Sequence, residues 1–168
     1  DGRLLTGRGQ FADDVRLPGM LHIAFARSPI ARGRIVAIDK AAALEVPGVH
    51  AVYTQDDFAH IKLDVMNFFF GPVTAPVKIL ADGRVACVGD PVAMVIADSR
   101  AIAEDAAALI DIEIEEETPV VSIGDARNGP PVHPGMESNI AQMMGDEEVD
   151  EDLQAILDGA AHKVSRSI

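Results

Sequence analysis

The chain has 168 residues, of which 48% are hydrophobic and only 4% are aromatic, and this length fits one globular domain with its own core. Its 14 basic and 27 acidic side chains give a formal charge of −13, which argues against binding to nucleic acid or to an anionic membrane. The single cysteine, Cys87, excludes an internal disulfide framework and any zinc or iron–sulfur site built from cysteines of this chain. No run reaches the roughly 20 apolar residues of a membrane span, and residues 1–9 lack a signal-peptide pattern, so we expect a cytoplasmic protein.

Residues 1–60 are predicted to form a loop followed by strands and short helices. Glycines and Pro18 mark loops and turns up to residue 19. Residues 20–27 alternate with period two, which predicts a strand with Leu21, Ile23 and Phe25 on one face and His22, Ala24 and Ala26 on the other. The next predicted elements are strands at 34–38 and 49–53, a helix at 40–45 capped by Asp39, and a helical turn opened by a capping box at 54–57.

Residues 61–116 are predicted to hold a long loop, a hairpin and the clearest helix. The loop at 61–77 contains Phe68-Phe69-Phe70, whose rings we expect to pack inward or against a partner. Asp82-Gly83 is a strong hairpin-turn signal between apolar segments at 79–81 and 85–87. The continuous apolar run at 92–97 is typical of a strand buried on both faces. A helix capped by Asp98 or Ser99 is expected to reach Ile110, followed by an alternating strand at 110–115 with one acidic face.

The remainder of the chain is expected to be less regular. Val120-Val121 continues as an edge segment after Pro119, and three prolines predict an extended surface path over 128–139. A strand is considered at 140–144, a short helix closed by Gly159 is expected at 153–158, and alternation resumes at 160–168, as if the domain continued. The strand–helix–strand units at 34–53 and 92–115, together with the hairpin, predict an α+β fold with mixed sheets.

No set of residues indicates an active site. The segment around Arg8 lacks the glycine spacing of a dinucleotide loop and favours a tight turn. The 5 histidines do not pair at helical spacing, as a metal site on a helix requires. Cys87 lies in an apolar segment, which favours a packed and unactivated thiol and leaves a catalytic Cys–His pair open. The acidic groups at 56–57, 104–105 and 113–117 could serve acid–base chemistry, but their spacing favours solvated faces.

Several segments, in order and at their spacing, resemble one family. They are Leu5-Thr-Gly-Arg-Gly-Gln-Phe-Ala-Asp-Asp, Leu17-Pro-Gly-Met-Leu-His, Ala26-Arg-Ser-Pro-Ile-Ala-Arg-Gly-Arg-Ile, Pro47-Gly-Val-His-Ala-Val-Tyr-Thr, Leu80-Ala-Asp-Gly-Arg-Val, Val88-Gly-Asp-Pro-Val-Ala and Ala97-Asp-Ser-Arg-Ala-Ile-Ala-Glu-Asp-Ala-Ala. Together they are similar to the amino-terminal α/β-hammerhead domain of molybdenum hydroxylase large subunits, the family of xanthine dehydrogenase, aldehyde oxidoreductase and carbon monoxide dehydrogenase. The resemblance implies a hammerhead domain at 1–125 and an extended connector at 126–168 leading toward a molybdenum-cofactor domain outside this chain.

The resemblance also implies a parent enzyme that hydroxylates a carbon centre, or oxidises carbon monoxide, with water as the oxygen source. Such large subunits bind molybdopterin cytosine dinucleotide in later domains, where the catalytic glutamate also lies. Two [2Fe–2S] clusters and FAD sit on other domains or subunits. We therefore expect no catalytic, cofactor-binding or metal residue in this chain. Its expected partners are the molybdenum-cofactor domain of the same subunit and the iron–sulfur and FAD subunits or domains.

The expected role is then structural: a docking domain that is inactive alone. Candidate docking residues lie on three segments with no other evident use: Arg8, Asp13 and Asp14; Phe68, Phe69 and Phe70; and Gly89, Asp90 and Pro91. Arg8 could form a bidentate pair with a partner carboxylate, or bind only a local carbonyl or solvent. One alternative is a freestanding protein-interaction module without a redox role, which would lack a large apolar patch. The other is a small hydrolase, which would need two acids converging in a pocket.

Overall fold

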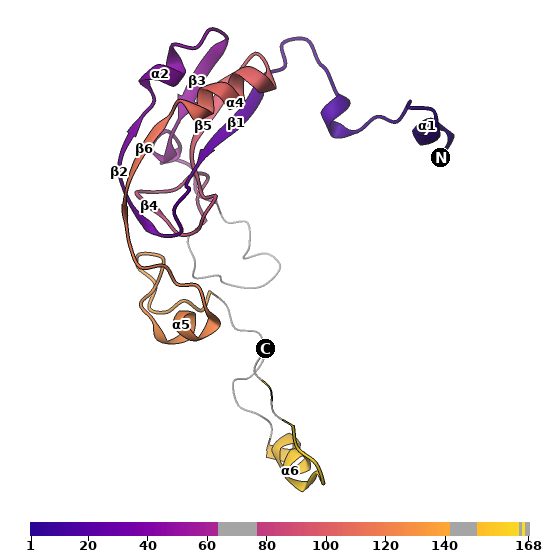
Figure 1. Cartoon of the computed structure of the whole chain (residues 1–168), viewed down its shortest axis with the longest axis vertical. Helices are drawn as coiled ribbons and strands as arrows, with labels where there is room; N and C mark the ends of the chain where they lie inside the picture. The colour runs from indigo at the N-terminus through magenta and orange to yellow at the C-terminus, as the bar shows by residue number, and fades with distance from the viewer. Residues whose placement is uncertain (64–76, 142–150, 165, 167–168) are drawn as a thin grey trace.

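The computed structural model describes residues 1–63, 77–141, 151–164 and 166. Its strands form two three-stranded antiparallel sheets (Figure 1). One sheet has the order β1-β5-β3, with β1 at His22–Arg27, β5 at Pro91–Ala97 and β3 at Val49–Tyr53. The other has the order β4-β2-β6, with β4 at Arg84–Val85, β2 at Gly33–Asp39 and β6 at Asp111–Glu116. This combination of helices and two small sheets confirms the α+β prediction, whereas the prediction of mixed sheets is wrong, since every described strand pair is antiparallel.

Both predicted strand–helix–strand units are present, and each connects the two sheets. In the first, β2 leads through α2 (Ala41–Leu44) to β3, and in the second, β5 leads through α4 (Arg100–Ala108) to β6. Ser99 caps α4, since its Oγ accepts a hydrogen bond from Ile102 N at 3.3 Å. Thr54 and Asp57 form the predicted capping box at the start of the 3₁₀ helix η2 (Gln55–Phe58). The N-cap of α2 is Lys40, one residue after the predicted Asp39, whose carboxylate accepts from Ala41 N at 2.9 Å.

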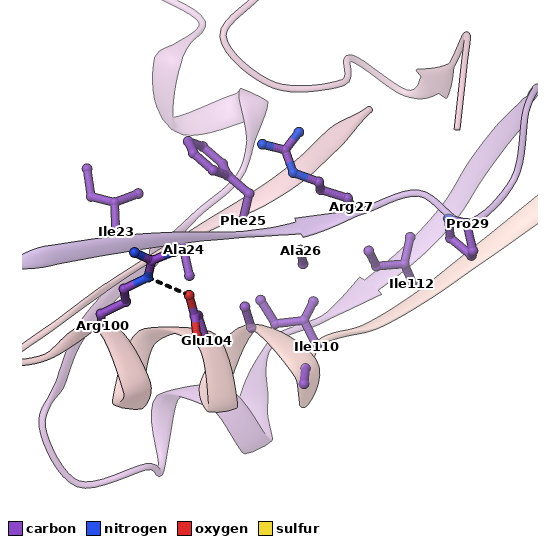
Figure 2. Close-up of a pocket in the computed structure, with 12 residues that line it drawn as sticks. Ile23, Ala24, Phe25, Ala26, Arg27, Pro29, Arg100, Glu104, Ile110 and Ile112 are labelled. Atoms are coloured by element: carbon purple, nitrogen blue, oxygen red, sulfur yellow. Dashed lines mark hydrogen bonds and ion pairs between the residues drawn. The ribbon is translucent and has the colours of Figure 1, made fainter. Parts of the chain in front are cut away.

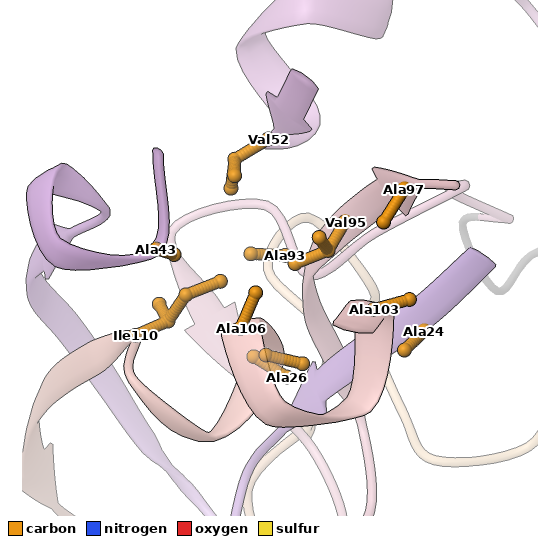
Figure 3. Packing of buried hydrophobic residues seen from close by; sticks show 11 residues of the cluster. Ala24, Ala26, Ala43, Val52, Ala93, Val95, Ala97, Ala103, Ala106 and Ile110 are labelled. Carbon is orange, nitrogen blue, oxygen red and sulfur yellow. The ribbon is translucent and has the colours of Figure 1, made fainter. Parts of the chain in front are cut away.

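The core lies between α4 and the sheet that contains β1 and β5, and it is made mostly of small side chains (Figure 3). Alanines occupy the contact from both sides: Ala24, Ala26, Ala93 and Ala97 from the strands, and Ala103, Ala106 and Ala107 from the helix. Val52, Val95, Ala43 and Ile110 complete the cluster. Since alanine side chains let helix and sheet approach closely, added volume at these positions has little room.

The predicted alternation in β1 is confirmed, and the buried face is the one that carries the alanines. Ala24 and Ala26 are buried under α4, whereas Ile23 is 53% exposed and Phe25 39% exposed. The two β1 side chains in the core cluster with the α4 alanines are themselves alanines. The two large apolar side chains of β1 therefore lie on the uncovered side.

The hairpin predicted around Asp82-Gly83 is wrong in its pairing. Gly83 does form a turn, with φ at +66°, but residues 79–81 are not a strand. β4 instead pairs with β2, and Gly83 O accepts a hydrogen bond from Ile35 N at 2.9 Å. The sequence signal for the turn is local, whereas the strand that pairs with β4 is β2, which lies far away in sequence.

The segment after β6 also differs from its prediction. No strand forms at 120–121, and an unpredicted helix, α5 (Ile123–Asn128), is capped by Ser122, whose Oγ accepts from Asp125 N at 3.0 Å. Residues 129–140 form turns and bends rather than an extended path. Asn139 holds them, since its amide accepts from Val132 N at 2.7 Å and donates to the carbonyls of Ala126 and Pro130.

The chain ends are partly described. The N-terminal arm, residues 1–21, contains α1 (Gly2–Leu5) and the 3₁₀ helix η1 (Ala12–Asp14), and it extends away from the sheets in Figure 1. The helix predicted at 153–158 is confirmed as α6 (Glu151–Gly159). Most of the segment considered as a strand at 140–144 lies outside the described residues, and residues 160–164 form no strand. No helix in the described ranges is long and apolar enough to cross a bilayer.

Candidate functional site

The turn at Gly89, Asp90 and Pro91 is fixed from within the chain. One oxygen of the Asp90 carboxylate accepts from Ala86 N at 2.6 Å and from Cys87 N at 3.3 Å. The other accepts from the Cys87 thiol at 3.2 Å. Gly89 has φ at +91°, a conformation that side chains with a Cβ rarely adopt. Asp90 therefore caps its own loop, and a docking role for this turn stays a prediction.

The environment of Cys87 argues against nucleophilic chemistry. The hydrogen bond from its thiol to Asp90 raises the pKa of Cys87, and partial burial and the negative charge of Asp90 raise it further. The thiol is therefore protonated near neutral pH, while nucleophilic attack requires the thiolate. The prediction of a packed thiol is wrong in one respect, because Cys87 is exposed rather than buried.

The same turn is bonded to the end of β1. Ser28 N donates to Asp90 O at 2.9 Å, and Gly89 N donates to Ser28 O at 2.8 Å. The Arg27 guanidinium donates to Gly89 O at 2.8 Å and lies over the Phe25 ring, 5.2 Å from its centroid. The structure thus joins a predicted docking segment to Arg27 and Phe25, which the sequence analysis did not select.

The other predicted docking residues are not brought to that turn by any contact in the described residues. Arg8 follows α1, where its backbone N donates to Arg3 O at 2.7 Å. Asp14 caps η1 by accepting from Phe11 N at 2.9 Å. Asp13 lies 3.7 Å from the Arg100 guanidinium on α4, and both side chains are largely exposed. Phe68, Phe69 and Phe70 lie outside the described residues.

The acidic end of β6 is used in ion pairs rather than left fully solvated as predicted. The Glu115 carboxylate lies 2.5 Å from Arg34, across the strand pair. Glu117 pairs with Arg84 and lies 3.4 Å from Arg32, whose side chain is only 13% exposed. Arg32 also donates to the carbonyls of Thr118 and Pro131, so it connects β2 to the segment after α5. The carboxylates of Glu115 and Glu117 are thus each paired with arginine rather than converging on a substrate site.

A groove of about 750 Å³ runs along β1 (Figure 2). β1 forms one side of it, where Ala24 and Ala26 point toward α4 and Ile23, Phe25 and Arg27 point to the opposite face of the strand. α4 and the start of β6 form the other side, with Arg100, Glu104, Ala107, Ala108, Ile110 and Ile112. Arg100 is paired with Glu104 at 2.8 Å within the groove.

The groove was missed because the strand alternation specified two faces without specifying which one α4 covers. The alanine content of 101–108 was the available signal, because an alanine-rich helix packs best on a face that is also small. The described residues contain no group of three or more His, Cys, Asp or Glu side chains able to hold a metal ion. The closest histidine–carboxylate contact given by the structure, His50 with Asp98 at 2.7 Å, is an exposed pair between β3 and the start of α4.

Comparisons with known proteins agree with this architecture. The family model "Aldehyde oxidase and xanthine dehydrogenase, a/b hammerhead domain" matches residues 6–118. The chain is 45% identical over 126 residues to the carbon monoxide dehydrogenase large chain of Hydrogenophaga pseudoflava, a match that covers 75% of this chain and 15% of that protein.

Solved structures extend the similarity to nearly the whole chain. Quinoline 2-oxidoreductase from Pseudomonas putida 86 superposes with a TM-score of 0.77 at 39% identity, over 96% of this chain and 21% of that one. A Cu,Mo-CO dehydrogenase superposes with a TM-score of 0.74 at 29% identity, over 95% of this chain and 21% of that one. This chain therefore spans about a fifth or less of the length of these relatives.

Proposed function

The chain belongs to the aldehyde oxidase and xanthine dehydrogenase a/b hammerhead family, and on this premise we propose that it is a docking domain of a molybdenum-dependent large subunit and is inactive alone. The observation that carries the proposal is the extent of the match. The similarity covers 96% of this chain but only 21% of a relative that is an oxidoreductase. Most of such an enzyme lies outside the segment that this chain corresponds to.

Within this proposal, residues 1–125 are the hammerhead domain and residues 126–168 are the connector toward the molybdenum-cofactor domain. The family match to 6–118 supports the first part. α5 spans the junction, and Arg32 and Asn139 bond the first part of the connector in place. The connector would thus leave the hammerhead in a defined direction over 126–139.

The described residues do not fit a metal centre. They lack a group of three metal-binding side chains, and the single cysteine is bonded to Asp90. We therefore derive no redox step through this chain. In the parent enzyme, molybdopterin cytosine dinucleotide would lie in the later domains and [2Fe–2S] clusters and FAD on other domains or subunits, which are the partners we propose.

Exposed apolar side chains support a docking role. They occur on the N-terminal arm, on β1 and on α6: Leu4, Leu5, Phe11, Leu17, Ile23, Phe25, Ile156 and Leu157. Scattered apolar side chains are normal on protein surfaces, but an arm and a strand face of this kind favour contact with another protein surface.

The substrate would be selected outside this chain. Two of the similar proteins, by their names, act on carbon monoxide and on quinoline, although both match this chain over most of its length. A domain shared by such different enzymes is a poor candidate for the site that distinguishes their substrates. The parent reaction would be hydroxylation of a carbon centre, or oxidation of carbon monoxide, with water as the oxygen source.

Activity assays on the isolated chain and on its complex test the proposal. The isolated 168-residue chain should show no turnover with aldehydes, purines or carbon monoxide in the presence of an artificial electron acceptor. The complex recovered from source cells by a tag on this chain should turn over at least one carbon-centred substrate. Turnover by the isolated chain, or a complex without oxidoreductase activity on any such substrate, would contradict the proposal.

A further inference from the structure

β1 is an edge strand, and its hydrogen bonds to neighbouring segments show which of its N–H and C=O groups point away from the sheet. In the described residues it pairs only with β5. Ser28 N and O are both bonded to the turn that precedes β5, so Ser28 faces β5. The register shift between Ala26 and Arg27 skips one residue of β5, Val92, and none of β1, so backbone groups still alternate along β1 and those of Ala26, Ala24 and His22 face β5 as well. The N–H and C=O groups of Ile23, Phe25 and Arg27 therefore face the open edge.

The bonding of β5 gives the same assignment independently. Asp98 N donates to Gly48 O, so Asp98 faces the β3 side, and Ala97, Val95 and Ala93 face β1. These are the residues in register with His22, Ala24 and Ala26. The open edge thus presents backbone donors and acceptors at 23, 25 and 27, the pattern that an added strand would pair with.

The groove beside this edge has the shape and polarity for such a strand. On the side of α4 it is lined by Ala24, Ala26 and Ala108, next to Ile110 and Ile112 at the junction with β6, while Ile23 and Phe25 lie on the other face of the same edge. Arg100 on α4 lies near two carboxylates, Glu104 at 2.8 Å and Asp13 at 3.7 Å. Among the described residues no carboxylate lies within ion-pair distance of Arg27, which contacts only a carbonyl and a ring. Arg27 is therefore the cation beside this edge that has no carboxylate partner among the described residues.

We propose that an extended segment of the same large subunit, from outside residues 1–168, binds along the free edge of β1 as an additional strand and places a carboxylate on Arg27. The inference rests on the proposed function, because it takes the remainder of such a subunit as the partner. Relatives provide that remainder, since this chain covers only 15% to 21% of their length. Backbone pairing would supply the affinity, and the pair with Arg27 would fix the register.

A second copy of this chain fits the edge less well. Two copies would each bring a charge of −13. An antiparallel pairing of β1 with its own copy would bring no carboxylate to Arg27, because residues 22–27 contain none. A segment from the same subunit is also held near the edge by the covalent chain, which raises its effective concentration.

Photo-crosslinking in the native complex tests the inference. Phe25→p-benzoylphenylalanine is introduced into the full-length large subunit, and the crosslinked peptide is identified by mass spectrometry. The matched control carries the same probe at Leu44, which is similarly exposed but lies on α2. The expected product joins position 25 to a large-subunit peptide outside 1–168 that contains Asp or Glu, and the control does not give that product.

Charge variants at Arg27 test whether the ion pair itself, and not only the closeness of the partner segment, supports the crosslink. Arg27→Glu should reduce the position-25 crosslink about tenfold, while Arg27→Lys retains most of it, because the charge persists. Arg127→Glu, on α5, is the control for a charge reversal elsewhere and should leave the yield unchanged. Equal loss with Lys and Glu would overturn the role of the ion pair.

The result distinguishes failure of the inference from failure of the proposed function. A complex that retains molybdenum, but whose position 25 links to a second copy, to another subunit or to nothing, overturns the strand pairing and leaves the docking function intact. A complex without molybdenum, or without any longer large subunit, overturns the proposed function and the inference with it.

Discussion

The packing around α4 and the contacts that hold residues 117–141 depend on different physics. Under α4, alanines from helix and strands meet in a close apolar contact with few polar groups. Around residues 117–141, Arg32, Glu117 and Asn139 hold the chain through ion pairs and hydrogen bonds to distant carbonyls. The first region should therefore respond to side-chain volume, and the second to charge and hydrogen-bonding capacity.

The largest effect is expected from added volume under α4. Ala106→Leu places three more carbon atoms in a position with no exposed surface, and overpacking of this kind costs about 1–3 kcal/mol. Urea unfolding of the chain measures this loss. Ala101→Leu, on the exposed side of the same helix, is the control and should change the free energy of unfolding by less than about 0.5 kcal/mol. Equal effects of the two variants would show that the contact is not tightly packed.

Removal of the charge on Glu117 should have the next largest effect. Glu117→Gln leaves Arg32 and Arg84 close together without the carboxylate between them, which should cost about 1–2 kcal/mol for partly exposed groups. Added salt should reduce the difference between variant and wild type, because salt screens the repulsion of the arginines. Glu113→Gln, on the exposed face of β6, is the control. A loss that is independent of salt would contradict the electrostatic account.

Asn139→Ala should loosen one segment rather than the whole fold. The variant removes an acceptor for Val132 N and donors for two carbonyls, at a cost of about 1–2 kcal/mol. Hydrogen exchange should therefore become faster at residues 130–139 while β5 and α4 keep their protection. Asn128→Ala loses a single bond to Gly124 O and serves as the control. Faster exchange throughout the sheets would mean that this segment is part of the main cooperative unit.

The smallest effect concerns Cys87 and pH. Because Asp90 raises the pKa of Cys87 above its ordinary value of 9.0, the unfolded chain loses the thiol proton first as pH rises. The stabilisation is therefore complete below pH 9.0 and is lost as pH rises through the pKa of the folded state. Asp90→Asn should lower that pKa and speed alkylation by iodoacetamide at pH 8 several-fold. Asp82→Asn is the control, and an unchanged rate in Asp90→Asn would contradict the proposed cause.

The same two regions differ in what their sequence reveals. Period-two and helical patterns predicted β1, β6 and α4, because those elements bury one face and the pattern repeats within a few residues, and a continuous apolar run predicted β5, which is buried on both faces. The exposed side of β1 was not predicted, since alternation alone does not say which face α4 covers. Arg32–Glu117 and Asn139–Pro130 left no sequence signal, because a polar contact between distant or irregular segments has no period. The hairpin failed for the same reason: β4 found its partner in β2, far away in sequence.

The candidate site also has one part with a local sequence signal and one part without such a signal. Gly89, Asp90 and Pro91 were selected from a turn signal, and the structure connects that turn to Arg27 through two backbone bonds of Ser28 and one side-chain bond. Arg27 and Phe25 were missed because their importance depends on an open sheet edge, which appears only when the strand order is known. Composition could exclude metal ligation by cysteine in this chain, but it could not locate a docking surface.

The most direct test of the docking role is the metal content of the complex that this chain belongs to. The chain is tagged in its source cells, the complex is purified, and molybdenum and iron are measured per tagged chain by inductively coupled plasma mass spectrometry. A docking domain of a molybdenum hydroxylase-type large subunit predicts about one molybdenum, with iron also present. A metal-free preparation of a single polypeptide would contradict this account and leave a fold shared with these enzymes but not their function.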